Sequence, residues 1–167
     1  MMDALLDGNY SGLTHLRFGR IDSGSNLALV ALARVLSSGK CPHLEELRMG
    51  SWAGPNHIED YEDDDVDLSL RLILEAIGAG CCRQLRRLGI VDAPVDTNHA
   101  RMLGQALRDG ACPLLEDLDL NYSNELSGRG LVHVFDALEY GACPHLKTIK
   151  VESIHLGPRG QHLWCMP

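Results

Sequence analysis

The chain has 167 residues, a formal net charge of −8 and a hydrophobic fraction of 45%. These values are typical of one soluble globular domain. No apolar run approaches the roughly 20 residues needed to cross a bilayer, and no basic segment precedes an apolar one at the start, so we expect neither a membrane partner nor a secretory signal. The acidic balance argues against nucleic acid as a partner, because phosphate binding needs a basic stripe.

A six-residue signature recurs along the chain at residues 39–44, 80–85, 110–115 and 141–146, with a degraded copy at residues 8–13. Its glycines are Gly8, Gly39, Gly80, Gly110 and Gly141, so the copies are spaced by 31, 41, 30 and 31 residues. Self-similarity at a nearly fixed distance indicates a repeat architecture.

Each signature leads into a Leu-x-x-Leu-x-Leu pattern whose last two apolar residues alternate with polar ones, which predicts a short half-buried strand. The apolar triplets are Leu13/Leu16/Phe18, Leu44/Leu47/Met49, Leu85/Leu88/Ile90, Leu115/Leu118/Leu120 and Leu146/Ile149/Val151.

Before each signature the apolar period changes to that of a helix. The predicted buried faces are Leu29/Leu32/Leu36, Leu70/Ile73/Ile77, Ala100/Leu103/Leu107 and Leu131/Val134/Leu138, joined by Val35, Ala76, Ala106 and Ala137. The signature glycine lies where a left-handed helix end is expected. Asp67 and Thr97 are the residues we expect to cap the second and third helices at their amino ends.

Residues 106–120, with their helix end, glycine turn and Leu-x-x-Leu-x-Leu strand, resemble the leucine-rich repeats of the ribonuclease-inhibitor type. The similarity covers the chain from Ala4 to about Leu163. It implies an α/β fold in which residues 1–167 form one domain of about four to five repeats. That fold would be a right-handed β-α solenoid, a segment of a horseshoe with a parallel inner sheet and outer helices. The sequence departs from the family where it usually has an asparagine after the strand, at Ile21, Trp52, Ala93, Ser123 and Ile154.

The first helix before residue 8 is mostly missing, and a new helix entry at residues 156–160 is followed by only seven residues. We therefore expect both ends of the domain to be open, as in part of a longer array or an incomplete product. Open ends would also permit self-association with another chain.

The strands are expected to present a ladder of outward side chains, and the resemblance implies that this concave face binds a protein. The candidate partner-binding residues are His15, Arg17, Glu46, Arg48, Arg87, Asp117, Asp119, Asn121, Tyr122 and Lys150. The alternative is local charge compensation, because neighbouring strands lie only about 4.8 Å apart. Just outside the ladder, Glu45, Arg86, Glu116 and Lys147 also alternate in sign.

An acidic insertion at residues 55–67 accounts for the single spacing of 41 residues. Its acidic loop residues are Glu59, Asp60, Glu62, Asp63, Asp64 and Asp65; with Asp67 they make seven acids, so the rest of the chain carries −8 + 7 = −1. A solvated loop is the preferred interpretation, docking of a basic partner comes second, and a weak cation site third. A calcium loop fails, because Leu68 and Leu74 replace its glycine and bidentate glutamate.

Four of the six cysteines, Cys41, Cys82, Cys112 and Cys143, occupy one repeat position and are expected as small buried residues. A metal or redox column lacks the close C-x-x-C spacing of zinc sites. No phosphate loop, nucleophile elbow or H-E-x-x-H motif occurs, so we predict no catalytic residue, no metal and no cofactor.

The sequence therefore favours a non-enzymatic protein–protein interaction module in the cytoplasm, where cysteines stay reduced. The resemblance leaves two alternatives open, an enzyme inhibitor of the ribonuclease-inhibitor type and a GTPase-activating leucine-rich repeat protein. A purely structural role is a further alternative.

Overall fold

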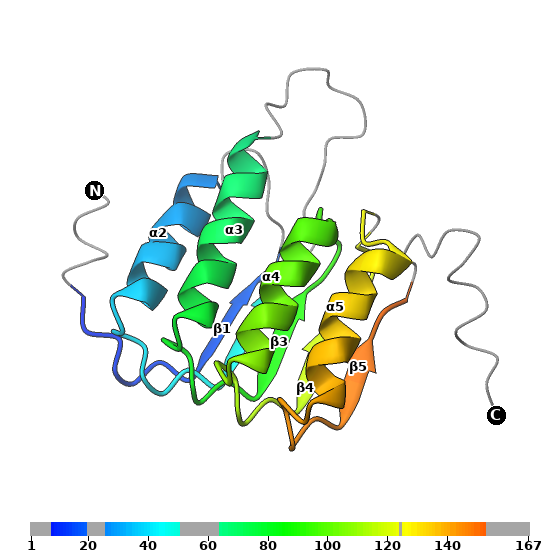
Figure 1. The fold of residues 1–167 in the computed structure, drawn as a ribbon. Coiled ribbons are helices and arrows are strands. Elements are labelled where there is room, and N and C mark those ends of the chain that lie inside the picture. Colours follow the sequence, from blue (N-terminus) through cyan, green and yellow to red (C-terminus); the bar gives the residue numbers. More distant parts are fainter. Residues whose placement is uncertain (1–7, 20–25, 51–63, 124, 153–167) are drawn as a thin grey trace.

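The computed structural model describes residues 8–19, 26–50, 64–123 and 125–152, which form an α/β arrangement of five parallel strands and four helices (Figure 1). The strands are β1 (His15–Phe18), β2 (Glu46–Met49), β3 (Arg87–Ile90), β4 (Asp117–Asp119) and β5 (Thr148–Lys150). The helices are α2 (Asn26–Ser37), α3 (Asp64–Gly78), α4 (Thr97–Arg108) and α5 (Gly128–Glu139). The strands lie in the sheet in chain order, so each strand–helix–strand unit advances the sheet by one strand.

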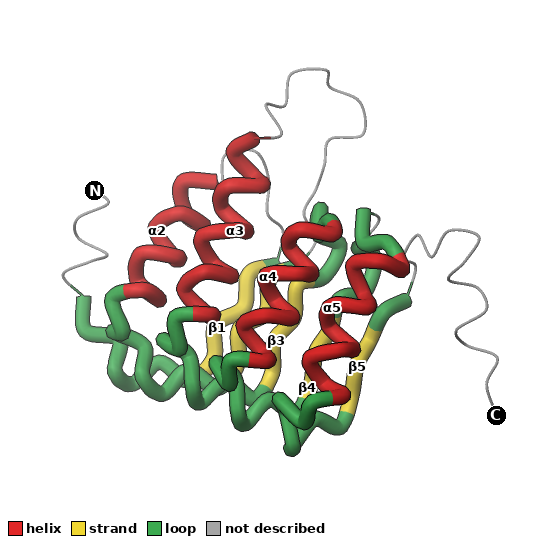
Figure 2. The backbone as a smooth tube through the Cα atoms, viewed as in Figure 1, coloured by secondary structure: helices red, strands yellow, loops and turns green. Residues whose placement is uncertain are grey.

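All four helices lie on one face of the sheet and leave its other face free of described helices (Figures 1 and 2). Successive helices are neighbours, with α2 packed on α3, α3 on α4 and α4 on α5. We call the helix-free side the open face of the sheet.

The core lies between the strands and the helices, and the predicted apolar faces form it. Leu47, Met49, Leu88 and Leu118 are fully buried from the strands, and every predicted helix-face residue is buried except Leu138. Leu138 is half-buried because no described helix lies beyond α5.

The signature turns have the predicted conformation. Gly39, Gly80, Gly110 and Gly141 all have φ between 68° and 77°, a region that favours glycine. The N–H of each glycine donates to the carbonyl three residues earlier, at distances of 2.9–3.0 Å. The four cysteines that follow are buried as predicted, and the carbonyl of each accepts the N–H of the leucine three residues on.

Both predicted helix caps are wrong. The cap of α4 is Asp96, one residue before Thr97, and its carboxylate accepts the N–H of His99 at 2.8 Å. Helix α3 already begins at Asp64, which places Asp67 inside its first turn.

The acidic loop is consequently shorter than predicted at its carboxyl end, since residues 64–67 are helical. The physical reason is that carboxylates in a first turn interact favourably with the unpaired N–H groups of a helix start. The predicted loop residues Glu59, Asp60, Glu62 and Asp63 lie outside the described residues.

None of the helices in the described ranges has the length and apolar character that a membrane span requires.

Candidate functional site

The open face carries two rows of side chains that run across the strands, in the register that the repeat predicted. The first row is His15, Glu46, Arg87, Asp117 and Thr148; the second row is Arg17, Arg48, Gly89, Asp119 and Lys150. Eight of the ten predicted site residues belong to these rows.

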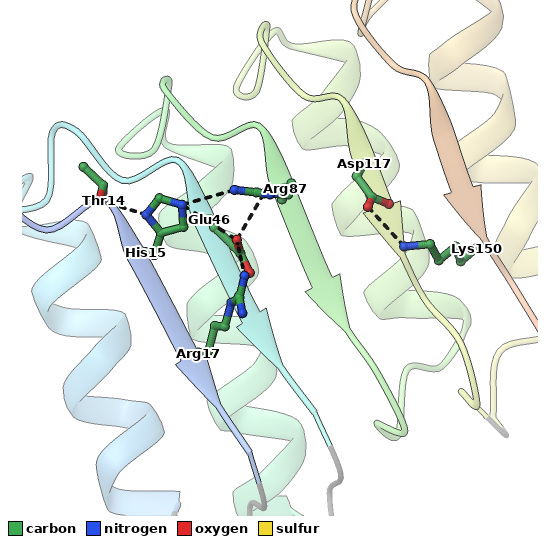
Figure 3. Close-up of polar contacts among 7 residues, drawn as sticks. All are labelled: Thr14, His15, Arg17, Glu46, Arg87, Asp117 and Lys150. Carbon is green, nitrogen blue, oxygen red and sulfur yellow. Dashed lines mark hydrogen bonds and ion pairs between the residues drawn. The ribbon is translucent and has the colours of Figure 1, made fainter.

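Glu46 is the centre of a charged cluster on β1, β2 and β3 (Figure 3). Its carboxylate accepts hydrogen bonds from Nε and Nη2 of Arg17, the second at 2.9 Å, and lies 3.1 Å from Nε of Arg87. Nη2 of Arg87 is also 3.1 Å from Nε2 of His15. The hydrogen bonds from Arg17 lower the pKa of Glu46, so this carboxylate is ionised at neutral pH.

A second cluster spans β2 to β5. Nη2 of Arg48 lies 3.2 Å from Oδ2 of Asp119, two strands away, and Nζ of Lys150 approaches the same oxygen at 3.9 Å. Between them lies Gly89, where an added Cβ would stand 3.0 Å from Cγ of Arg48. The missing side chain at this position therefore gives Arg48 its path across β3.

The predicted exposure of two site residues is wrong. The side chains of Glu46 and Asp119 are only 4% and 6% exposed. The reason is that parallel strands place long arginine side chains close beside these shorter carboxylates, and the guanidinium groups lie directly against them.

Local charge compensation would allow Arg87 to pair with Glu46 or with Asp117. Arg87 pairs with Glu46, and Oδ2 of Asp117 lies 3.1 Å from Nζ of Lys150 (Figure 3). Its Oδ1 is buried and has no hydrogen-bond partner among the described residues. The predicted ladder of compensating charges therefore forms.

Asn121 and Tyr122 follow β4 and are not part of the rows. Oδ1 of Asn121 accepts the N–H of Glu152 at 2.7 Å, which ties the end of β5 to the end of β4. Tyr122 is 47% exposed, as predicted, and has φ of 61°, an unfavourable conformation for a bulky residue.

The charges beside the rows also pair. Glu116 lies 2.6 Å from both Arg86 and Lys147, and hydrogen bonds from Lys147 and then Arg86 lower its pKa. Glu45, the fourth residue of this predicted set, is half-buried beside them.

The open face contains a small hollow lined in part by Gly89, with a volume of about 30 Å³. Its walls come from the two rows: Glu46, Arg48, Arg87, Asp117 and Asp119. Such a volume holds about one or two water molecules, so the hollow does not enclose an organic ligand.

The cysteine column has no features of a reactive site. Burial raises the pKa of Cys82 and of Cys112 to about 12, which keeps both thiols protonated at neutral pH. In the part of the chain that the structure describes, no three His, Cys, Asp or Glu side chains converge as metal ligands.

One buried polar group away from the open face was missed from the sequence. The ring of His99 is buried between α3 and α4, with Nδ1 2.7 Å from Oδ1 of Asp96 and Nε2 3.3 Å from Oδ1 of Asp67. The D-x-x-H spacing of residues 96–99 was the available signal, because a cap residue and the residue three positions later reach one another's backbone.

Comparison with known proteins assigns this chain to no family. No protein-family description matches this sequence, and no curated protein matches it.

Proposed function

We propose that this chain is a non-enzymatic protein-interaction module that binds its partner on the open face of the sheet. In this proposal the fold is a right-handed β-α solenoid of the leucine-rich-repeat, ribonuclease-inhibitor-like type, and the open face is its concave surface. The proposed setting is the cytoplasm, which agrees with five free cysteines among the described residues.

The observation that carries the proposal is a continuous charged surface on the face that the helices leave free. It crosses all five strands, and its hollow is too small for an organic ligand. A wide, shallow and polar surface of this kind suits a protein better than a metabolite.

The surface is also preorganised. Arg17, Arg48 and Arg87 are each held by a carboxylate of a neighbouring strand or the strand beyond it. Ordering a long side chain on binding costs about 0.5–1.5 kcal/mol. Because these three are already ordered, a partner meets a lower entropic cost.

Site-specific photo-crosslinking tests the proposal. A photoreactive residue at Thr148, exposed on the open face, should give adducts with a partner in extracts of the source cells, whereas the same residue at Glu75, exposed on α3, should not. The variant Arg48→Gln/Arg87→Gln should lose the adducts, and Arg83→Gln/Arg101→Gln, with the same charge change at exposed positions away from the rows, should keep them. Equal adducts from both positions would refute the assignment of the open face.

Self-association is a second mode within this proposal, because β1 and β5 form the two edges of the described sheet. Light scattering over a concentration series tests it, and a constant monomer mass would exclude it. The inhibitor and GTPase-activating alternatives depend on the family resemblance alone.

A further inference from the structure

In the two rows of the open face, the arginine and lysine side chains are more exposed than the carboxylates that they contact. The side chains of Arg17, Arg48, Arg87 and Lys150 are 63%, 48%, 49% and 38% exposed. Among the carboxylates that they contact, Glu46 and Asp119 are nearly covered, at 4% and 6%, and Asp117 is 30% exposed. A partner therefore meets ammonium and guanidinium groups first, although the whole chain carries a charge of −8.

The exposed arginines also have guanidinium hydrogen-bond donors that their contacts with other described side chains do not use. A guanidinium has five N–H donors. Arg17 and Arg87 each use Nε and Nη2, and Arg48 uses Nη2, in the contacts with other described side chains. The Nη1 group of all three arginines donates no hydrogen bond to another residue that the structure describes.

We infer that the partner on the open face is an acidic protein segment whose carboxylates bind the guanidinium groups of Arg17, Arg48 and Arg87. This inference rests on the proposed function and adds the chemistry of the partner. A carboxylate is the side-chain group that matches the forked guanidinium donors, and such bonds are stronger than those between neutral groups.

The spacing of the arginines defines the segment further. The outer pair, Arg17 and Arg87, is two strands apart and offset by two residues along the strands, so about 10 Å across and about 7 Å along separate them by about 12 Å. An extended peptide covers that distance in about four residues. The partner segment should therefore carry at least two carboxylates within about four consecutive residues.

The negative charge of the whole chain does not oppose this binding strongly. Seven acids belong to residues 59–67, and the remainder of the chain sums to −1. At physiological salt, exposed charges more than about 8 Å apart are largely screened. The contacting groups thus determine the interaction, and these are cationic.

A defined peptide pair tests the inference. The probe is a fluorescent peptide of about ten residues in which glutamate alternates with serine, long enough to cross three strands. Its control has glutamine in place of every glutamate. Fluorescence anisotropy should show binding of the glutamate peptide alone, weakened between about 50 and 150 mM salt.

Matched variants locate the contact. Arg17→Gln/Arg48→Gln/Arg87→Gln should weaken binding by about tenfold or more, whereas Arg34→Gln/Arg83→Gln/Arg101→Gln, three exposed arginines outside the rows, should change it less than about twofold. The first variant leaves Glu46 without its arginines and could unfold. The unmutated chain is therefore also titrated by NMR, where amide shifts should concentrate on β1, β2 and β3.

Three results would overturn the inference: equal binding of the glutamate and glutamine peptides, equal losses in the two triple variants, or shifts confined to the helices. Displacement of the peptide by lower concentrations of an oligouridylate would also overturn it, since the face would then prefer a nucleic acid. If the inference fails while crosslinking from Thr148 persists, the proposed interaction function still holds with a partner of different chemistry. Loss of both signals would reject both proposals.

Discussion

Replacing Glu46 by glutamine tests whether the covered carboxylate holds the open face together. The substitution keeps the size of the side chain and removes its charge. Oε2 of Glu46 lies 2.9 Å from Nη2 of Arg17 and 3.1 Å from Nε of Arg87. An amide NH₂ in the place of this oxygen would put two hydrogen-bond donors against each other.

The expected cost follows from these contacts. A hydrogen bond to a charged group contributes about 1.5–3 kcal/mol, and breaking a buried ion pair costs about 3–5 kcal/mol. Both arginines are half-exposed or more, so water can solvate them again, which reduces the cost. We expect a loss of about 2–3 kcal/mol in the free energy of unfolding, or about 4–12 °C in melting temperature for a chain of this size.

The assay is thermal and urea unfolding followed by circular dichroism for the unmutated chain and the Glu46→Gln variant. Glu116→Gln is the control, because Glu116 also contacts two basic side chains but is far more exposed, at 28%. A much smaller shift is expected for it, as for exposed ion pairs in general. Equal shifts in the two variants, or none in Glu46→Gln, would refute the stabilising role of the covered carboxylate.

Three further predictions concern packing, backbone strain and acid stability. Gly104→Ala should lower the free energy of unfolding by about 1–3 kcal/mol, because the added Cβ would lie 2.3 Å from the carbonyl oxygen of His133 on α5. Gly78→Ala is the control: its Cβ would lie 3.5 Å from Cβ of Ala106, an ordinary contact, so the variant should be neutral or stabilising in the same urea assay. Tyr122→Gly should raise the unfolding free energy by about 1 kcal/mol by relieving its positive φ, and a lowered urea midpoint would contradict this. The contribution of Glu46 to stability should be constant above about pH 5 and fall below about pH 4 in urea titrations, because its lowered pKa means that folding favours its ionised form. A midpoint unchanged between pH 5 and pH 3 would oppose this.

The architecture was predictable because the repeat fixes the register. Once the signature glycines align, His15 must lie beside Glu46, and Glu46 beside Arg87, as the sheet shows. The same alignment predicts which helix residues face the core. A period supported by four copies therefore constrains the strand register and the helix faces more strongly than the secondary-structure propensity of any single segment does.

The helix starts were less predictable because several neighbouring residues could serve as caps. Asp96 and Thr97 are both good cap residues, and the choice depends on His99, whose ring and backbone reach Asp96 from the next turn. At α3, the run of acids is compatible with either a solvated loop or a first helical turn. The sequence at residues 64–67 does not distinguish the two.

The accessibility of the charges was not predictable from their order along the strands. Alternating signs across the sheet indicate pairing, but they do not indicate which partner covers the other. That outcome depends on side-chain length: the longer arginines reach the carboxylates of other strands with their guanidinium groups, which contact the carboxylates and stay about half-exposed. The sequence pattern predicts a balanced ladder, whereas the structure presents a cationic surface above covered acids.

Gly89 occupies a repeat position at which the other four strands carry a charged side chain, and it leaves room there for Arg48. It is the only member of the second row without a side chain, and it lies between Arg48 and Asp119. A larger residue there would crowd Arg48, whose Cγ would lie 3.0 Å from the new Cβ. If Arg48 moved off Asp119, the carboxylate would keep the longer ion pair with Lys150, at 3.9 Å, and the hydrogen bond from the N–H of Asn121, at 3.2 Å. Asp119 would then be more accessible, and the open face would expose acids as well as bases. The cationic character of the surface thus depends on a glycine in the strand as much as on the arginines themselves.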